Sequence, residues 1–134
     1  MPDLSRALLV FAVALLLAAA APAAATGGIA CSSPDDAASV EIAIGHVPGL
    51  AVVGARIGVG DRDWAMNLGG AQALTVSQAF ASDGHYWIDF ADEIVNEIVA
   101  ELRLHRVDEG MDTGFGGTMR MPGIGAWTLV CSEG

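Results

Sequence analysis

The sequence predicts a mainly β domain, in which about eight short antiparallel strands form a small barrel or sandwich with one short helix. Two observations predict this class. Apolar and polar residues alternate with a period of two in many short segments, as they do in strands with one buried face. Clusters of glycine, proline and aspartate separate these segments at regular intervals, and such clusters form turns.

The first 25 residues are expected to be a signal peptide, followed by a single exported β-rich domain over residues 26–134. Residues 7–21 form an apolar run of the length of a signal h-region. The small residues at 23–25 favour cleavage after Ala25, which would leave no membrane segment and a periplasmic or secreted protein. Two alternatives are a retained anchor, for which Pro22 interrupts the run, and a lipid-modified Cys31.

Cys31 and Cys131 are the two cysteines of the chain and are predicted to form a disulfide. Disulfides persist in oxidising compartments, in agreement with export. The bond would join the first and last strand regions across a loop of about 100 residues, for which the chain-entropy model gives about 4.7 kcal/mol. A redox role would favour a short C-x-x-C spacing, which the sequence lacks.

The chain after the signal peptide divides into a loop, alternating strands and one ambiguous segment. A loop is expected over residues 26–38. A short helix is predicted from about Asp92 to Ile98, because apolar residues there have helical spacing and Asp92 can cap it. A single helix running to Arg106 is the alternative. Strands are expected at residues 39–44, 50–59, 64–68, 73–81, 85–90, 100–107, 118–121 and 126–131.

Residues 73–90 are predicted to form a hairpin around a two-residue Asp83-Gly84 turn of type I′. That register places Phe80 opposite Trp87 and Gln78 opposite Asp89, with Val76 on the same face as Phe80. Both faces of the hairpin are apolar, so both are expected to be covered, one of them by the helix.

Composition excludes several functions. The formal net charge is −10, so nucleic acid and anionic membranes repel the chain and a basic partner or a cation suits it. All six basic residues are arginine, which removes Schiff-base lysine chemistry and the P-loop lysine. No motif for a cofactor is present, and none is expected.

The residues that point to a site lie mainly in an acidic, glycine-rich loop expected over residues 108–117. Asp108, Glu109 and Asp112 form a possible partner surface there. Calcium is an alternative ligand, but the spacing does not match an EF-hand. The histidines lack a close metal-binding pattern, so no metal site is predicted. The three tryptophans, Trp64, Trp87 and Trp127, are expected in the core because each lies on an alternating strand.

The segments Ile98–Leu104 and Gly117–Gly123, with the closing strand to Cys131, resemble small exported bacterial β-domain proteins without an assigned activity. The likeness is confined to the C-terminal half and implies no catalytic residues. In outline the expected architecture is also similar to small periplasmic β-barrel inhibitors of lysozyme. Residues 82–86 contain the serine and tyrosine of their inhibitory loop but displace its glycine, and a shared fold does not give a shared function.

The function expected from the sequence is therefore binding rather than catalysis. The protein is expected to be an exported, non-enzymatic β domain that binds an envelope or extracellular partner, most concretely as an acidic inhibitor of a basic hydrolase. One alternative is a structural envelope protein without a ligand. Another is a small hydrolase with His/Asp chemistry, in which His85 would act with Asp89.

Overall fold

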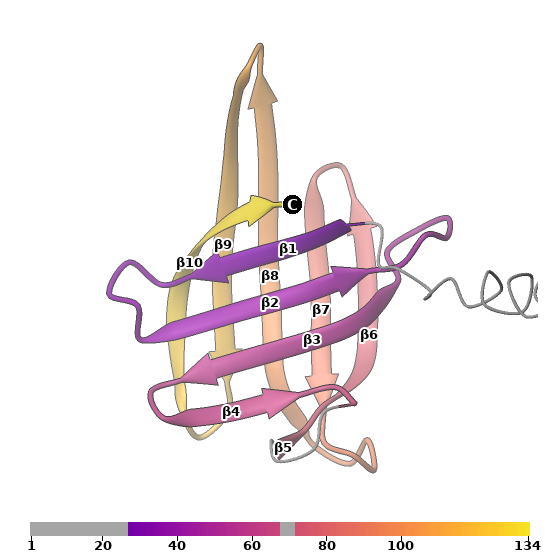
Figure 1. Ribbon diagram of the computed structural model, residues 1–134, viewed down its shortest axis with the longest axis vertical. Coiled ribbons are helices and arrows are strands. Elements are labelled where there is room, and N and C mark those ends of the chain that lie inside the picture. The colour runs from indigo at the N-terminus through magenta and orange to yellow at the C-terminus, as the bar shows by residue number, and fades with distance from the viewer. Residues whose placement is uncertain (1–26, 68–71) are drawn as a thin grey trace, which may run out of the picture.

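The computed structural model of the protein describes residues 27–67 and 72–134 as ten strands in one sheet (Figure 1). The predicted signal peptide lies outside the described residues. No helix in the described part is long and apolar enough to cross a membrane. The strands are β1 (Gly27–Ser32), β2 (Ala38–Ile44), β3 (Val52–Val59), β4 (Arg62–Ala65), β5 (Gln72–Ala73), β6 (Thr75–Ser82), β7 (His85–Ala91), β8 (Ile98–Glu109), β9 (Asp112–Met121) and β10 (Gly125–Glu133).

Each strand pairs with the next one along the chain within β1–β5 and within β6–β10. Pairing of β1 with β10 joins these two halves into one sheet that nearly closes into a barrel. The strand order is β5-β4-β3-β2-β1-β10-β9-β8-β7-β6, and only the short β4–β5 pair is parallel. Pairing of β1 with β10 brings the two ends of the described chain side by side. The free edges of the sheet are β5 and β6. The predicted mainly β, barrel-like class is confirmed, with ten strands in place of about eight.

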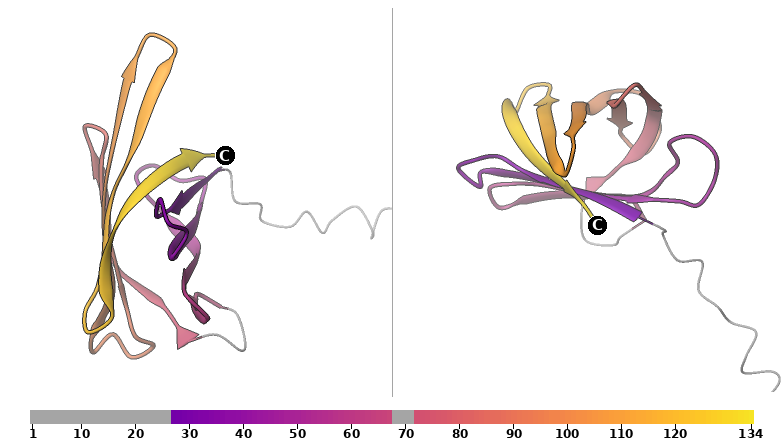
Figure 2. Two further views of the ribbon diagram at one scale, coloured as in Figure 1. Left: turned by 90° about the vertical axis from the view of Figure 1, so that its left-hand side faces the viewer. Right: turned by 90° about the horizontal axis from the view of Figure 1, so that it is seen from above.

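The sheet folds into two layers that cross at a steep angle. Strands β1–β4 lie in front of β6–β9, and β10 bends from one layer to the other (Figures 1 and 2). Inward-facing side chains of both layers meet between them and form the core. Its largest fully buried members are Ile29, Val40, Ile57, Ile88, Phe90, Leu102, Leu104, Met119, Met121 and Leu129.

The predicted disulfide is present at the seam between β1 and β10. Cys31 and Cys131 are direct cross-strand partners with Cα atoms 4.0 Å apart. Cys31 is buried in the core and Cys131 is half-buried. This bond indicates an oxidising environment outside the cytoplasm.

The hairpin of β6 and β7 has the predicted turn and register. Asp83 and Gly84 both have positive φ, 50° and 75°, as a type I′ turn requires. Phe80 pairs with Trp87 and Gln78 with Asp89. A bulge between residues 76 and 78 reverses the side-chain alternation. Val76 consequently packs against the core instead of sharing a face with Phe80.

The helix predicted at residues 92–98 is wrong, as is the longer helix to Arg106. The segment is a tight loop, closed by hydrogen bonds from Asp92 N–H to the Glu97 carbonyl and from Val95 N–H to the Asp92 carbonyl, both 3.0 Å. The Asp92 side chain caps no helix and instead accepts a hydrogen bond from Asn96 N–H at 2.7 Å within this loop. So short an apolar pattern does not offset the cost of nucleating a helix. Ile94 remains 78% exposed.

Two segments expected as loops contain strands. β1 lies within residues 26–38, and β9 begins at Asp112. Turn residues at 32–36 predicted the first loop, and acidic residues and glycines predicted the second. In β9 the glycines instead allow close approach of neighbouring strands. A Cβ on Gly116 would overlap the carbonyl oxygen of Leu129, and one on Gly117 would overlap that of Arg103.

The expectation that both faces of the β6–β7 hairpin are covered is wrong for the described residues. Phe80 is 53% exposed on the outer face, and Trp87 packs beside it with ring centroids 5.4 Å apart. Trp64 is buried and Trp127 packs against the core, as expected. The expectation is wrong for Trp87, which faces outward because it alternates on β7 with the buried Ile88 and Phe90.

Candidate partner-binding site

The β8–β9 hairpin projects beyond the rest of the molecule (Figures 1 and 2). β7 pairs with β8 as far as His105, and β10 pairs with β9 as far as Gly116. Beyond these residues the two strands pair with each other, out to Glu109 and Asp112. Gly110 has a φ of 61°, and a glycine at the first central position suits the type II′ turn that it forms with Met111.

A polar network on the inner face fixes the base of this hairpin. Arg106 forms ion pairs with Glu133 of β10 and, at 3.2 Å, with Asp108. Thr113 donates its hydroxyl to Asp108 at 2.5 Å, which ties β9 to β8. Tyr86 of β7 donates to Glu133 at 3.4 Å. Four strands therefore hold the direction in which the hairpin projects.

The hydrogen bonds and ion pairs of this network shift the pKa values of its members. The hydrogen bond from Thr113 and then those from Arg106 hold the pKa of Asp108 below its ordinary value. Hydrogen bonds to Asp108 and Glu133 raise the pKa of Arg106. Burial, followed by the charge of Glu133, raises the pKa of Tyr86. Each ionic group of the network has a partner of opposite charge, so the network orients the hairpin and leaves its tip to make contacts.

We expect the Thr113→Val variant to raise the pKa of Asp108 toward its ordinary value, measured by NMR titration of the carboxyl carbon. The folded-state pKa is the lower one. Ionised Asp108 therefore stabilises the fold above its unfolded-state pKa, and this contribution is lost as the pH falls through the folded-state pKa. Thr128→Val, an exposed threonine on β10, is the control. An unchanged pKa in Thr113→Val would contradict the assignment.

The tip of the hairpin presents an exposed thioether beside two unpaired carboxylates. Met111 is fully exposed, and Val107 on the outer face is 56% exposed. Glu109 and Asp112 are direct cross-strand partners on exposed strand ends. Neither has an ion pair within residues 27–67 and 72–134. Like charges directly opposite each other destabilise a hairpin, so this pair favours a cation or a basic group from outside.

The three predicted acidic residues thus separate onto two faces. Asp108 points inward, into the network with Arg106 and Thr113, whereas Glu109 and Asp112 lie at the outer tip. In the described chain, no group of three metal-ligating side chains is positioned to hold an ion. Sequence reasoning missed the supporting residues Tyr86, Arg106 and Glu133. The strand predicted at residues 100–107 already contained Arg106, and its alternation places Arg106 on the same face as Leu102 and Leu104.

The structure does not bring His85 and Asp89 together. They lie four residues apart on β7, with Trp87 between them. Asp89 forms an ion pair with Arg103 at 2.7 Å. His85 stacks on His105, with ring centroids 3.9 Å apart, and also on Trp87.

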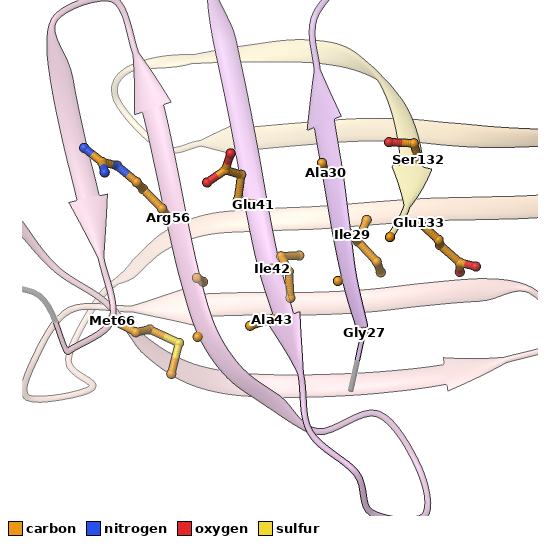
Figure 3. Close-up of a pocket in the computed structure, with 14 residues that line it drawn as sticks. Gly27, Ile29, Ala30, Glu41, Ile42, Ala43, Arg56, Met66, Ser132 and Glu133 are labelled. Atoms are coloured by element: carbon orange, nitrogen blue, oxygen red, sulfur yellow. The ribbon is translucent and has the colours of Figure 1, made fainter. Parts of the chain in front are cut away.

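A hollow of about 700 Å³ lies on the outer face of β1, β2 and β3 beside the end of β10 (Figure 3). It is hollow because Gly28, Ala43 and Gly54 are successive cross-strand partners without long side chains. Glu41 and Arg56 line it, and Arg56 pairs with Asp63 at 3.4 Å. Ser132 and Glu133 complete its polar lining, which contains no histidine or cysteine among the described residues.

Comparison of the chain with protein-family models, with curated proteins and with solved structures gave no match in any of the three. Assignment of a function therefore depends on the geometry and charge of the surfaces described above.

Proposed function

We propose that the protein is a non-catalytic binding protein of the periplasm or the extracellular space, whose β8–β9 hairpin contacts a basic partner protein. An acidic inhibitor that inserts this hairpin into the cleft of a basic hydrolase is the most concrete form. The opposed Glu109 and Asp112 carboxylates at a projecting tip carry the proposal. Their repulsion is relieved when a basic group lies between them.

The shape and chemistry of the tip support insertion. The hairpin is narrow, and its base is held by Arg106, Asp108 and Glu133, so little ordering is required on binding. Met111 supplies an adaptable apolar contact at the apex, and the carboxylates beside it supply charge complementarity. The net charge of −10 would steer a basic partner toward the protein at low salt.

The test is capture of proteins from an envelope extract on the immobilised protein at low salt. We expect a basic protein to be retained and to be released at high salt, because exposed charges are screened. The Glu109→Gln/Asp112→Asn variant should lose this capture. The matched control is Asp36→Asn/Asp61→Asn, which removes two exposed turn charges elsewhere. Equal capture by both double variants, or capture of no basic protein, would exclude the proposal.

The same Glu109→Gln/Asp112→Asn variant should be more stable than the wild-type protein, although it binds less. Removal of an opposed like-charge pair is expected to raise the free energy of unfolding by about 0.2–1 kcal/mol. Urea unfolding at low salt measures this change. Lower stability together with lost capture would show instead that the substitutions had damaged the hairpin.

A further inference from the structure

The eight-residue strand β6 lies at one end of the sheet and is paired on one side only. β7 is its hydrogen-bonded neighbour, and within the residues described by the structure no strand pairs with its other edge. Alternate peptide groups of an edge strand point away from the sheet. β6 therefore offers backbone donors and acceptors to a further strand.

β6 lacks the features that usually protect an edge from pairing. Residues 75–82 contain no charged residue and no proline. A bulge interrupts the strand at Ser77, but the segment from Gln78 to Ser82 pairs regularly with β7. Four of its five side chains are exposed, and Ala79 is the exception. The result is a regular, uncharged edge of five residues with Phe80 at its centre.

Phe80 gives this edge an apolar contact. Phe80 is 53% exposed on the outer face and packs against Trp87, which in turn stacks on the exposed His85. A strand alongside β6 would cover the exposed side of Phe80. Such a strand would remove from water the apolar surface on the outer face of the β6–β7 hairpin, which was expected to be covered and is exposed.

The charges around this edge balance, unlike those of the whole molecule. Asp89 pairs with Arg103 at 2.7 Å, and Glu101 pairs with Arg120 at 2.9 Å. A chain with a net charge of −10 repels a second copy over most of its surface. This face is locally neutral, so its charges neither repel a second copy nor attract a basic partner.

We propose that two copies of this chain associate through antiparallel pairing of their β6 strands, centred on Phe80. A two-fold axis at Phe80 places Gln78 opposite Ser82 of the second copy and Ala79 opposite its Ala81. Polar residues then meet polar residues, and alanine meets alanine. The two phenylalanine rings meet at the axis, in an interface that uses the same patch of both copies.

Neither the charge of Asp83 nor the acidic β8–β9 hairpin obstructs this dimer. Asp83 at the turn would lie opposite Ser77 of the second copy. The two Asp83 residues would then be six strand residues apart, roughly 20 Å, which exceeds the screening length of about 8 Å at physiological salt. The β6–β7 and β8–β9 hairpins point the same way in one copy (Figure 1). The antiparallel second copy would point its hairpins the opposite way and leave both acidic tips free.

The first test is the molar mass of the purified, disulfide-intact protein in solution, by light scattering and sedimentation over a wide concentration range. We expect a dimer for the wild-type protein and a monomer for Phe80→Arg, which would place two guanidinium groups at the axis. Val130→Arg is the matched control, because Val130 is 61% exposed on the outer face of β10. It should remain dimeric. Far-UV circular dichroism checks that both variants fold.

The second test is the register of the pair. Gln78→Cys and Ser82→Cys variants, mixed in equal amounts and mildly oxidised, should form a disulfide between the two different variants. Each variant alone should form much less of it, because neither position faces itself across the axis. A monomeric wild-type protein, a dimer that persists in Phe80→Arg, dissociation of Val130→Arg, or absence of the mixed disulfide would each overturn the proposal.

Discussion

Loss of the Cys31–Cys131 bond is expected to lower the free energy of unfolding by up to about 4.7 kcal/mol, the chain-entropy value for a loop of about 100 residues. The sequence separation of the two cysteines is 100. Domains of this kind have total stabilities of about 5–15 kcal/mol, so the bond accounts for a large share. It also lies at the seam where β1 meets β10, in a short ladder that pairs residues 29–32 with 130–133 and ends at two hydrogen bonds between Gly28 and Gly134.

The measurement is urea unfolding of the wild-type protein, oxidised and reduced, and of the Cys31→Ala/Cys131→Ala variant. Cys31 is 5% exposed, so alanine at this position also removes core packing. Reduced wild-type protein keeps both sulfur atoms and isolates the effect of the cross-link. We expect the reduced protein and the variant both to unfold at lower urea. Midpoints that coincide for oxidised and reduced protein would contradict a stabilising role.

The Gly117→Ala variant is expected to lose about 3 kcal/mol of stability, the upper end for overpacking a core. A Cβ at this position would overlap the carbonyl oxygen and carbonyl carbon of Arg103, and these backbone atoms cannot rotate away. Relief would require β8 and β9 to separate. Both strands carry the buried row of Leu102, Leu104 and Met119, so that separation would disturb the core.

Gly114→Ala, on the same strand, is the matched control for Gly117→Ala. Its Cβ would lie 3.3 Å from Cγ2 of Val107, an exposed side chain that can move. We expect a change within about 0.5 kcal/mol, as for most surface substitutions. Thermal and urea unfolding of both variants give the comparison. Equal effects of the two substitutions would show that strand propensity, and not the close approach to Arg103, sets the requirement for glycine.

Local patterns were sufficient for much of the fold. Asp83-Gly84 specifies a turn whose two residues have positive φ, and that turn sets the register of Phe80 against Trp87. The alternation around Val40 and Ile57 likewise predicts strands with one buried face. These features depend on residues close together in the chain, so they were predictable from the sequence alone.

The candidate site was predictable only in part. The acidic residues 108–112 were identified from composition. Their separation onto two faces depends on which residues of β8 point inward and which point outward. Glu133 joins Arg106 because the last residues of β10 leave β9 and pair with β1, which brings Glu133 to Arg106 from 27 residues further along the chain. Contacts over such distances depend on the packing of the whole sheet and have no local signature.

By itself, the sequence determined the mainly β class, the β6–β7 hairpin and the pairing of Cys31 with Cys131, because turn chemistry, alternation and a single cysteine pair leave few alternatives. Only the tertiary structure decided the fate of residues 92–106 and the role of the glycines in β9. The apolar spacing after Asp92 suits a short helix as well as a strand. Pairing of β8 with strands on both sides supplies the hydrogen bonds and burial that select the strand.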